Sequence, residues 1–253
     1  MARIHPTAIV EEGAVLDSSV EVGAYAFLGR EVEIGPGTVI GHHATVEGRT
    51  RLGRENHVYP YAFLGGRTHD LKHRGGSPGL RVGDGNTFRE YTTVHCATDD
   101  GEWTRMGNGN TVLAYSHIAH DCQVGDHLIM SSHAALGGHV LVGDHANIGW
   151  GSGVHQFCRI GAYSMVGAAT KLVRDLPPFF LADGNPAEIK TINRVGLERA
   201  GFPPEAIRAI HHAYRLLHRE GLTRKEAITR LRAEAGEDDS VRAILAFLEE
   251  SER

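Results

Sequence analysis

The sequence is poor in cysteine and in aromatic residues. Its three cysteines, Cys96, Cys122 and Cys158, are odd in number and lack a paired spacing such as CxxC, so neither a disulfide framework nor a cysteine metal site is indicated. Aromatic residues make up only 7% of the 253 residues, whereas 32 residues are glycine. This composition is typical of a chain that turns often and does not build its core from stacked aromatic rings.

The chain also lacks a long hydrophobic run and an excess of basic charge. Its first residues, MARIHPTAIV, show neither the basic start and apolar stretch of a signal peptide nor a membrane span, so we expect a cytoplasmic protein without membrane insertion. A net charge of −5 and a pI near 6.4 give no overall basic field for nucleic acid. An acidic partner would therefore need a local basic patch.

What the sequence does contain is a repeat of six residues. From Ile4 to Leu172 every sixth residue is apolar, except Asp70, Gly76 and Asp100. A period of six is neither helical nor simply alternating; it fits a short strand and a turn that direct one side chain per unit to a central axis. Three units of six would close one triangular coil, so residues 18 apart should stack at about 4.8 Å.

The interruptions and the end of the repeat predict the domain organisation. Residues 65–81 and 95–105 are polar and glycine-rich, which predicts two loops extruded from a prism, a usual place for binding residues. We predict a mainly β domain over residues 1–176 that includes both loops. A connector is expected over 177–190, and a C-terminal α-helical subdomain over 191–253.

Helical periodicity supports this subdomain. Ile210 and Tyr214 fall on one face of a first helix, and Thr223 with Glu226 fits a capping box at the start of a second. Ile244 lies in the apolar pattern of a third. The other residues of these apolar faces are Ile207, Leu217, Val241, Leu245 and Leu248.

Position within the repeat distinguishes a few of the 17 histidines. His120, Gly138 and Gln156 each stand two places after an inward residue and should stack on consecutive coils, with Asp121 and His139 in the adjoining column. A neutral imidazole can accept a proton near pH 7, and a glycine N–H can closely approach a developing oxyanion. The column is therefore a candidate cleft wall for acyl transfer. Neighbouring positions are held by His117, Gly137 and His155.

Other chemistries fit the sequence less well. Hydrolysis through a nucleophile is less attractive, because Cys122 near His120 does not follow the order of a cysteine hydrolase. Zinc on His117, His120 and His139 is the alternative from another class, because γ-class carbonic anhydrases place three histidines on zinc in a β-helix. The helical tail and both loops would be superfluous to such an enzyme. We therefore expect no metal and no cofactor, and a purely structural β-helix is a third interpretation.

Longer motifs carry a family resemblance. The segments HIAHDCQVGDH (117–127), AALGGHV (134–140) and GVHQFCRIGA (153–162) resemble the UDP-N-acetylglucosamine O-acyltransferase family of lipid A biosynthesis, within the hexapeptide-repeat acyltransferases. The resemblance also includes IHPTAIVEEGA, HDLKHRGG and NRVGLERAGF, and it covers essentially the whole chain. It implies a left-handed parallel β-helix, a homotrimer, and transfer of a 3-hydroxyacyl group from acyl carrier protein to the 3-hydroxyl of UDP-N-acetylglucosamine.

The resemblance also implies roles for individual residues. His120 matches the general base, Asp121 the acid that orients it, and Gly138 the glycine whose N–H binds the thioester oxyanion. Ala168 stands where the family sets acyl-chain length. The positions that match substrate-binding residues are Asp70, Lys72, His117, His139, His155, Gln156, Asn193 and Arg199.

The sequence departs from the family at Val195, Ala200 and Pro186, so the sequence does not fix how these positions contact the nucleotide and the acyl chain. The sequence also does not decide between a 3-hydroxyl and a 3-amino acceptor, because a related N-acyltransferase uses the same donor and a histidine. That enzyme usually carries an extra N-terminal domain, whereas the repeat here starts at Ile4. An acidic carrier protein could be received by basic residues of the tail, or these could form a solvated helix face: Arg215, Arg219, Arg224 and Lys225.

Overall fold

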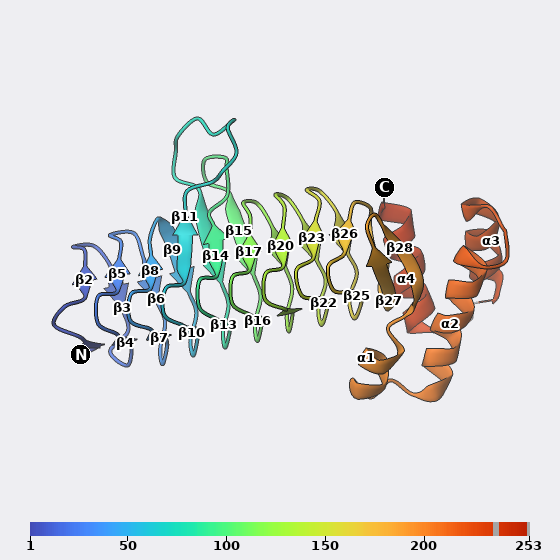
Figure 1. Ribbon diagram of the computed structural model, residues 1–253, viewed down its shortest axis with the longest axis horizontal. Helices are drawn as coiled ribbons and strands as arrows, with labels where there is room; N and C mark the ends of the chain where they lie inside the picture. Colours follow the sequence, from blue (N-terminus) through green and yellow to red (C-terminus); the bar gives the residue numbers. More distant parts are fainter. Residues whose placement is uncertain (235–237, 252–253) are drawn as a thin grey trace.

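The computed structural model of the protein describes residues 1–234 and 238–251. Short parallel strands wind into a long three-sided prism, a left-handed parallel β-helix, and four helices follow at its C-terminal end (Figure 1). The predicted fold class is confirmed. Among the described residues, no helix combines the length and apolar character that crossing a membrane requires.

Each side of the prism is one sheet, and consecutive strands visit the three sheets in turn. In spatial order, sheet A contains β1 (Arg3–Ile4), β4 (Glu21–Val22), β7 (Val39–Ile40), β10 (His57–Val58), β13 (Thr87–Phe88), β16 (Thr111–Val112), β19 (Ile129–Met130), β22 (Asn147–Ile148), β25 (Met165–Val166), β27 (Phe180–Gly184) and β28 (Ala187–Ile192). Sheet B contains β2 (Ile9–Val10), β5 (Phe27–Leu28), β8 (Thr45–Val46), β11 (Phe63–Gly66), β14 (Thr93–His95), β17 (His117–Ile118), β20 (Ala135–Leu136), β23 (Gly153–Val154) and β26 (Lys171–Leu172). Sheet C contains β3 (Val15–Leu16), β6 (Glu33–Ile34), β9 (Arg49–Leu52), β12 (Gly79–Val82), β15 (Trp103–Met106), β18 (Gln123–Val124), β21 (Leu141–Val142) and β24 (Arg159–Ile160).

Neighbouring coils keep the register that the six-residue repeat predicts. Paired residues of β1 and β4 lie 18 positions apart in the sequence. Where a loop leaves the prism, the step lengthens to 30, as between His57 and Thr87, or to 24, as between Thr93 and His117. Pairing then returns to steps of 18, so the loops are inserted without disturbing the stack.

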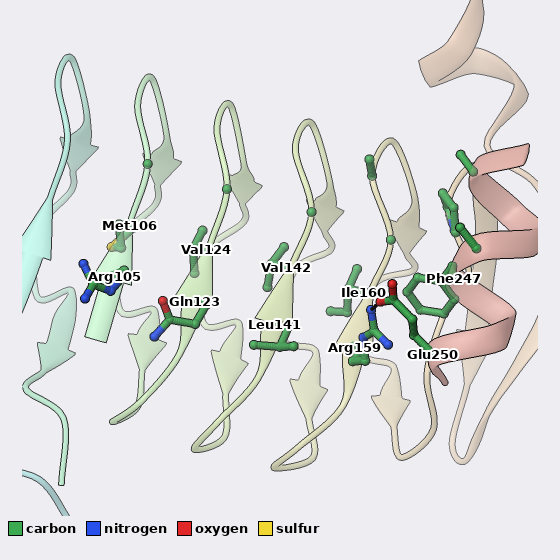
Figure 2. A pocket seen from close by; sticks show the side chains of 18 of the residues that line it. Arg105, Met106, Gln123, Val124, Leu141, Val142, Arg159, Ile160, Phe247 and Glu250 are labelled. Carbon is green, nitrogen blue, oxygen red and sulfur yellow. Dashed lines mark hydrogen bonds and ion pairs between the residues drawn. The ribbon is translucent and has the colours of Figure 1, made fainter. Parts of the chain in front are cut away.

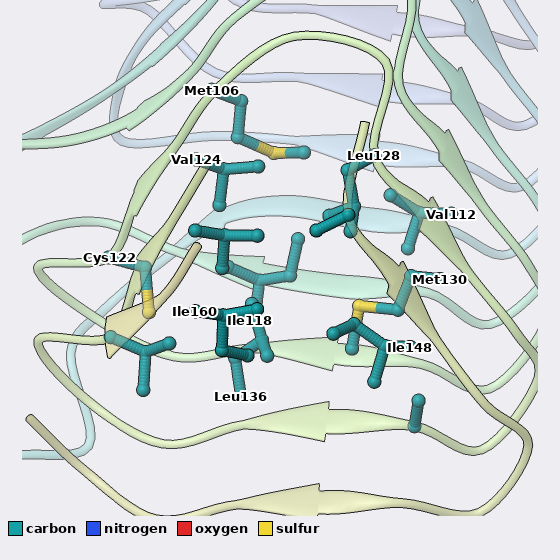
Figure 3. Close-up of a cluster of buried hydrophobic side chains, with 14 of the residues drawn as sticks. Met106, Val112, Ile118, Cys122, Val124, Leu128, Met130, Leu136, Ile148 and Ile160 are labelled. Atoms are coloured by element: carbon teal, nitrogen blue, oxygen red, sulfur yellow. The ribbon is translucent and has the colours of Figure 1, made fainter. Parts of the chain in front are cut away.

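The inward residues of the repeat form the core. Ile118, Leu136 and Ile148 are fully buried and point into the interior of the prism, as Figure 3 shows. Cys122 and Leu128 come from a second inward column, four places after the first, and are equally buried. Burying a side chain of this size contributes about 1.5–3 kcal/mol, and every coil adds its own set.

The two extruded loops are shorter than predicted. β11 continues to Gly66 and β12 begins at Gly79, while β14 continues to His95 and β15 begins at Trp103, so the loops are residues 67–78 and 96–102. The flanking residues stay in the ladder because β12 pairs over four residues with both of its neighbours. The two loops rise from the same side of the prism (Figure 1).

The predicted connector over residues 177–190 contains regular structure. β27 pairs with β25 in parallel and β28 turns back antiparallel to β27, so sheet A is extended beyond the repeat. Met165 pairs with Leu181, which is 16 rather than 18 positions later. The six-residue period is lost here, although the strand is not. The proposed division into domain units stays a prediction.

The helical tail consists of α1 (Arg194–Arg199), α2 (Pro204–His218), α3 (Arg224–Glu234) and α4 (Asp239–Glu250). The three predicted helices are confirmed, and α1 is an additional short one. The predicted capping box is present, because the Thr223 N–H donates to the Glu226 carboxylate over 2.8 Å and the Glu226 N–H donates to the Thr223 hydroxyl over 3.3 Å.

Candidate active site

Three turns that join sheet B to sheet C stack on consecutive coils. They comprise residues 119–122, 137–140 and 155–158, and we call them the BC edge. The His139 N–H donates to the carbonyl of His120, and the Phe157 N–H donates to the carbonyl of Gly138, both over 3.0 Å. The predicted column of residues 120, 138 and 156 therefore occupies one edge of the prism.

His120 is oriented by the residue that follows it. Its Nδ1 lies 2.8 Å from Oδ2 of Asp121, and the two side chains are only 12% and 13% exposed. Because a carboxylate only accepts, Nδ1 carries the proton and donates it in this hydrogen bond. The lone pair of the neutral ring is then on Nε2, the form of imidazole that can act as a general base.

The charge of Asp121 is maintained despite its partial burial. Burial raises the pKa of this carboxyl, but hydrogen bonds from His120 and from Thr98 outweigh it, and the net effect holds the pKa below its ordinary value. His139 adds to this effect, with Nε2 3.5 Å from Oδ2 of Asp121. The carboxylate is therefore anionic at neutral pH.

Gly138 lies directly beneath the His120 ring. A Cβ added at this glycine would lie 2.4 Å from Cε1 and 2.7 Å from Nε2 of His120, so any larger residue would displace the imidazole. Within the described chain the Gly138 N–H donates to no acceptor. A buried N–H without a partner is costly, and this one belongs to the residue that packs against the His120 ring.

The loops complete the surroundings of His120. Thr98, on loop 96–102, places its hydroxyl 3.1 Å from Nδ1 of His120 and 2.9 Å from the hydroxyl of Thr68 on the other loop. The Asp70 N–H donates to Thr68 over 3.1 Å, and the Asp70 carboxylate accepts from the Lys72 N–H over 2.8 Å. Ligand-type atoms of Asp70, His120 and His139 lie within 4.8 Å of one another.

A second histidine group adjoins this one. Nitrogen atoms of His69, His95 and His117 lie within 4.8 Å of one another, and His95 is only 4% exposed. Burial first, and the nearby imidazoles second, lower the pKa of His95 to about 4. Burial also lowers the pKa of His117. Both rings are therefore neutral near pH 7.

This division separates the three histidines of the zinc alternative. His117 groups with His69 and His95, whereas His120 and His139 group with Asp70. The set of His117, His120 and His139 that the sequence offered for zinc is not among the clusters of the described residues that could hold a metal ion.

Other predicted site residues lie on the same edge or far along the prism. His155 and Gln156 are exposed on the third turn of the BC edge. Asn193 caps α1, accepting from the Gly196 N–H over 3.2 Å and donating to the Tyr163 carbonyl over 2.8 Å. Arg199 is exposed at the end of α1. A single chain therefore does not bring Asn193 and Arg199 to the turn that carries His120.

Ala168 also lies on a different edge. It is exposed on the turn from β25 in sheet A to β26 in sheet B, whereas His120 stands on a turn between sheets B and C. The candidate for setting acyl-chain length and the candidate base thus occupy different edges of one prism. Both can serve one site only if a second copy contributes.

Sheet C carries a shallow groove of about 760 Å³ that ends at α4. Figure 2 shows Gln123, Leu141 and Arg159 on successive strands, with Phe247 and Glu250 of α4 at the end of the row. Arg159 donates to Glu250 over 2.7 Å. The residues that line this groove include none of the candidate catalytic residues, so its size does not identify the reactive site.

Most of the tail arginines expected to receive a carrier protein are engaged within the tail. Arg215 pairs with Glu220 at 3.3 Å, and Arg219 donates to the hydroxyl of Tyr214 over 2.8 Å. Arg224 donates to the carbonyl of Leu248 over 2.7 Å. Docking of an acidic protein on these residues and on exposed Lys225 stays a prediction.

The cysteines supply no nucleophile to this site. All three thiols are free and buried. Burial raises the pKa of Cys122 to about 12 and that of Cys96 to about 11. Since the thiolate is the nucleophilic form, burial disfavours Cys122 and Cys96 as nucleophiles at neutral pH.

Comparison with known proteins identifies the family. The family model "Udp N-acetylglucosamine O-acyltransferase; Domain 2" matches residues 175–253. The acyl-(acyl-carrier-protein)-UDP-N-acetylglucosamine O-acyltransferase of Paraburkholderia phymatum is 51% identical over 100% of this chain and 98% of its own. The chain belongs to the UDP-N-acetylglucosamine O-acyltransferase family.

Solved structures agree with this membership. LpxA from Acinetobacter baumannii superposes with a TM-score of 0.95 at 39% identity, covering 99% of this chain and 98% of that chain. UDP-N-acetylglucosamine O-acyltransferase (LpxA) from Moraxella catarrhalis gives a TM-score of 0.94 at 39% identity, with the same coverage. The family resemblance found in the sequence is confirmed, including its extent over the whole chain.

Family membership does not by itself point to every residue around the base. The sequence analysis did not single out Thr98, although it contacts both His120 and Asp121. It also missed His69 and His95, which lie beside His117. A signal for the two histidines exists, because both lie at or near the points where the repeat is interrupted. For Thr98 the sequence offers no comparable signal.

Proposed function

We propose that this UDP-N-acetylglucosamine O-acyltransferase family member transfers a 3-hydroxyacyl group from acyl carrier protein to the 3-hydroxyl of UDP-N-acetylglucosamine, the first step of lipid A biosynthesis. The observation that carries the chemistry is His120, held through Nδ1 by Asp121 and packed against Gly138, whose N–H has no acceptor in the described residues. Full-length relatives near 50% identity bear the name of this activity. We place this reaction in the cytoplasm.

The reaction follows from these positions. Nε2 of His120 takes the proton of the sugar hydroxyl as its oxygen attacks the thioester carbonyl, and the carboxylate of Asp121 stabilises the imidazolium that forms. The Gly138 N–H donates to the oxyanion of the tetrahedral intermediate. The carbon–sulfur bond then breaks, and the imidazolium returns its proton to the carrier-protein thiolate. No metal takes part in any step.

The remaining site residues support a role in binding. His117, His139, His155 and Gln156 line the nucleotide-sugar site in this proposal, and Asp70 with Lys72 contact the sugar and acyl groups. Asn193, Arg199 and Ala168 belong to other parts of the prism and tail, so a neighbouring subunit of a homotrimer supplies them. Arg199 suits the phosphate side of the nucleotide, because a guanidinium binds phosphate oxygens in a fixed planar geometry.

One assay tests the proposal against its alternatives. Purified protein is incubated with a panel of 3-hydroxyacyl carrier-protein thioesters and either UDP-N-acetylglucosamine or its 3-amino analogue, and the products are read by mass. We expect an ester product, and turnover should withstand a metal chelator. Turnover of the amino analogue alone would assign the chain to the N-acyltransferases. Absence of both products would refute acyl transfer to a nucleotide sugar.

A further inference from the structure

The group of His69, His95 and His117 has no part in the proposed proton transfer. We propose that these three side chains bind a divalent transition-metal cation of the zinc type, and that its binding inhibits the enzyme. The proposed chemistry does not require a metal, so this is a regulatory site next to the reactive one. The inhibition rests on the proposed function, whereas the binding does not.

The arrangement of the three rings suits such a cation. Imidazole nitrogen is a preferred zinc ligand, with Zn–N distances of about 2.0–2.1 Å, and three histidines leave one position for water. The nitrogens of His69, His95 and His117 already lie within 4.8 Å of one another, with ring centroids of His95 at 4.0 Å from His69 and 4.9 Å from His117. A small contraction around the ion completes the site.

Two of the ligands are held in place by the prism. His95 ends β14 and His117 begins β17, adjacent strands of sheet B. Nδ1 of His117 lies 2.8 Å from the hydroxyl of Thr93, which can accept its proton and leave Nε2 as the ligand atom. This outer hydrogen bond fixes the ring as in established metal sites.

The remaining two features point to an occupant. Nδ1 of His95 is buried and has no hydrogen-bond partner in residues 1–234 or 238–251. A buried polar atom left unpaired is costly, and an ion bound to this nitrogen would remove that cost. His69 is exposed on loop 67–78, so it can move the short distance that the ion requires.

The site is placed to affect the reaction. Asp70 follows His69 directly and belongs to the group that contains His120. An ion on His69 would hold this part of the loop and occupy the space beside the base, where His117 is expected to meet the nucleotide sugar. We therefore expect inhibition that competes with UDP-N-acetylglucosamine.

Cobalt titration of the full chain tests the binding. Co²⁺ alone is added, and the ligand-field absorption of a low-coordinate site is followed for wild type, His69→Gln, His120→Ala and His57→Gln. We expect one site per chain in wild type, about 100-fold weaker binding in His69→Gln, and wild-type binding in the other two variants. His57 is an exposed histidine of sheet A and controls for surface binding. Isothermal titration with Zn²⁺ should reproduce the order.

The outcomes separate this site from its neighbour and from the proposed function. Equal binding by wild type and His69→Gln, or no saturable binding by wild type, would overturn the proposal. Loss of binding in His120→Ala would move the ion to the Asp70 group and overturn it as well. Inhibition by Zn²⁺ is then measured in the acyl-transfer assay. The Zn²⁺ concentration that halves the activity should be about 100-fold higher for His69→Gln than for wild type. Binding without any acyl transfer would refute the proposed function and leave the cation site standing.

Discussion

The interior of the β-helix and the two extruded loops are stabilised in different ways. In the prism every coil packs on the coil before it, and side chains such as Leu136 are fully buried among identical layers. Loops 67–78 and 96–102 are joined by a few polar contacts, including Thr68 with Thr98 at 2.9 Å and the Ser77 N–H with Asp100 at 2.7 Å. The prism therefore accounts for most of the stability, and the loops position side chains around His120. Substitutions in the prism should lower the free energy of unfolding, whereas substitutions around His120 should lower activity.

His120 stands on the prism and is the proposed base, so its removal should affect chemistry far more than stability. We expect His120→Ala to lower kcat by about 10³-fold, since it removes the general base. Its thermal unfolding midpoint should fall by only about 2–4 °C, because the ring lies outside the apolar core and its contacts with Asp121 and Thr98 contribute about 1 kcal/mol. His57→Ala is the matched control and should keep full turnover. Wild-type-like kcat in His120→Ala would refute the assignment of the base.

Leu136 tests the other side of the comparison. We expect Leu136→Ala to lower the free energy of unfolding by about 2–5 kcal/mol, because it removes a fully buried side chain and leaves a cavity. Leu141, on the next strand, is 40% exposed on the outer side of sheet C, so Leu141→Ala should cost only about 0.5 kcal/mol. Denaturant unfolding measures both. Equal losses of unfolding free energy in the two variants would show that the buried column does not account for the stability of the prism.

Asp121 links the prism to catalysis through charge. The folded-state pKa of its carboxyl lies below the ordinary value, so the carboxyl stays ionised at any pH above this lowered pKa. It loses its charge only as the pH falls through the lowered pKa. The orienting carboxylate is therefore present throughout the neutral pH range. Asp121→Asn removes the anion that stabilises the imidazolium formed during the reaction, so kcat at pH 7 should fall about 10²-fold in the acyl-transfer assay. A wild-type kcat in Asp121→Asn would contradict this role.

Thr98 tests whether a loop contact positions the base. Thr98→Val keeps the shape but removes the hydroxyl that contacts His120 and Thr68, so we expect kcat to fall about tenfold and the free energy of unfolding to fall by about 1 kcal/mol. Thr98→Ser keeps the hydroxyl and should restore kcat. If the serine variant were as slow as the valine variant, the methyl group rather than the hydrogen bond would be responsible.

The same contrast explains what could be predicted from the sequence. A fixed period places His120 over Gly138 because each coil repeats the geometry of the last, and that stacking is observed. Thr98 lies in a loop without a period, and its position depends on tertiary hydrogen bonds that no spacing encodes. The strand β27 was missed for a related reason, since it pairs 16 rather than 18 residues after β25.

Ala168 provides the finest test, because it changes neither the prism nor the base. The family resemblance places an acyl-length determinant at this exposed turn residue, and a methyl group there should shorten the pocket relative to glycine. We expect Ala168→Gly to raise the kcat/KM of a longer 3-hydroxyacyl donor relative to a shorter one by about fourfold per methylene, which corresponds to ~0.8 kcal/mol. Turnover of carrier-protein thioesters of graded length measures this ratio, with the free energy of unfolding as the control. Because Ala168 and His120 lie on different edges of one chain, a shift in preference would also mean that the acyl chain crosses to a second copy, whereas an unchanged ratio would remove Ala168 from the site.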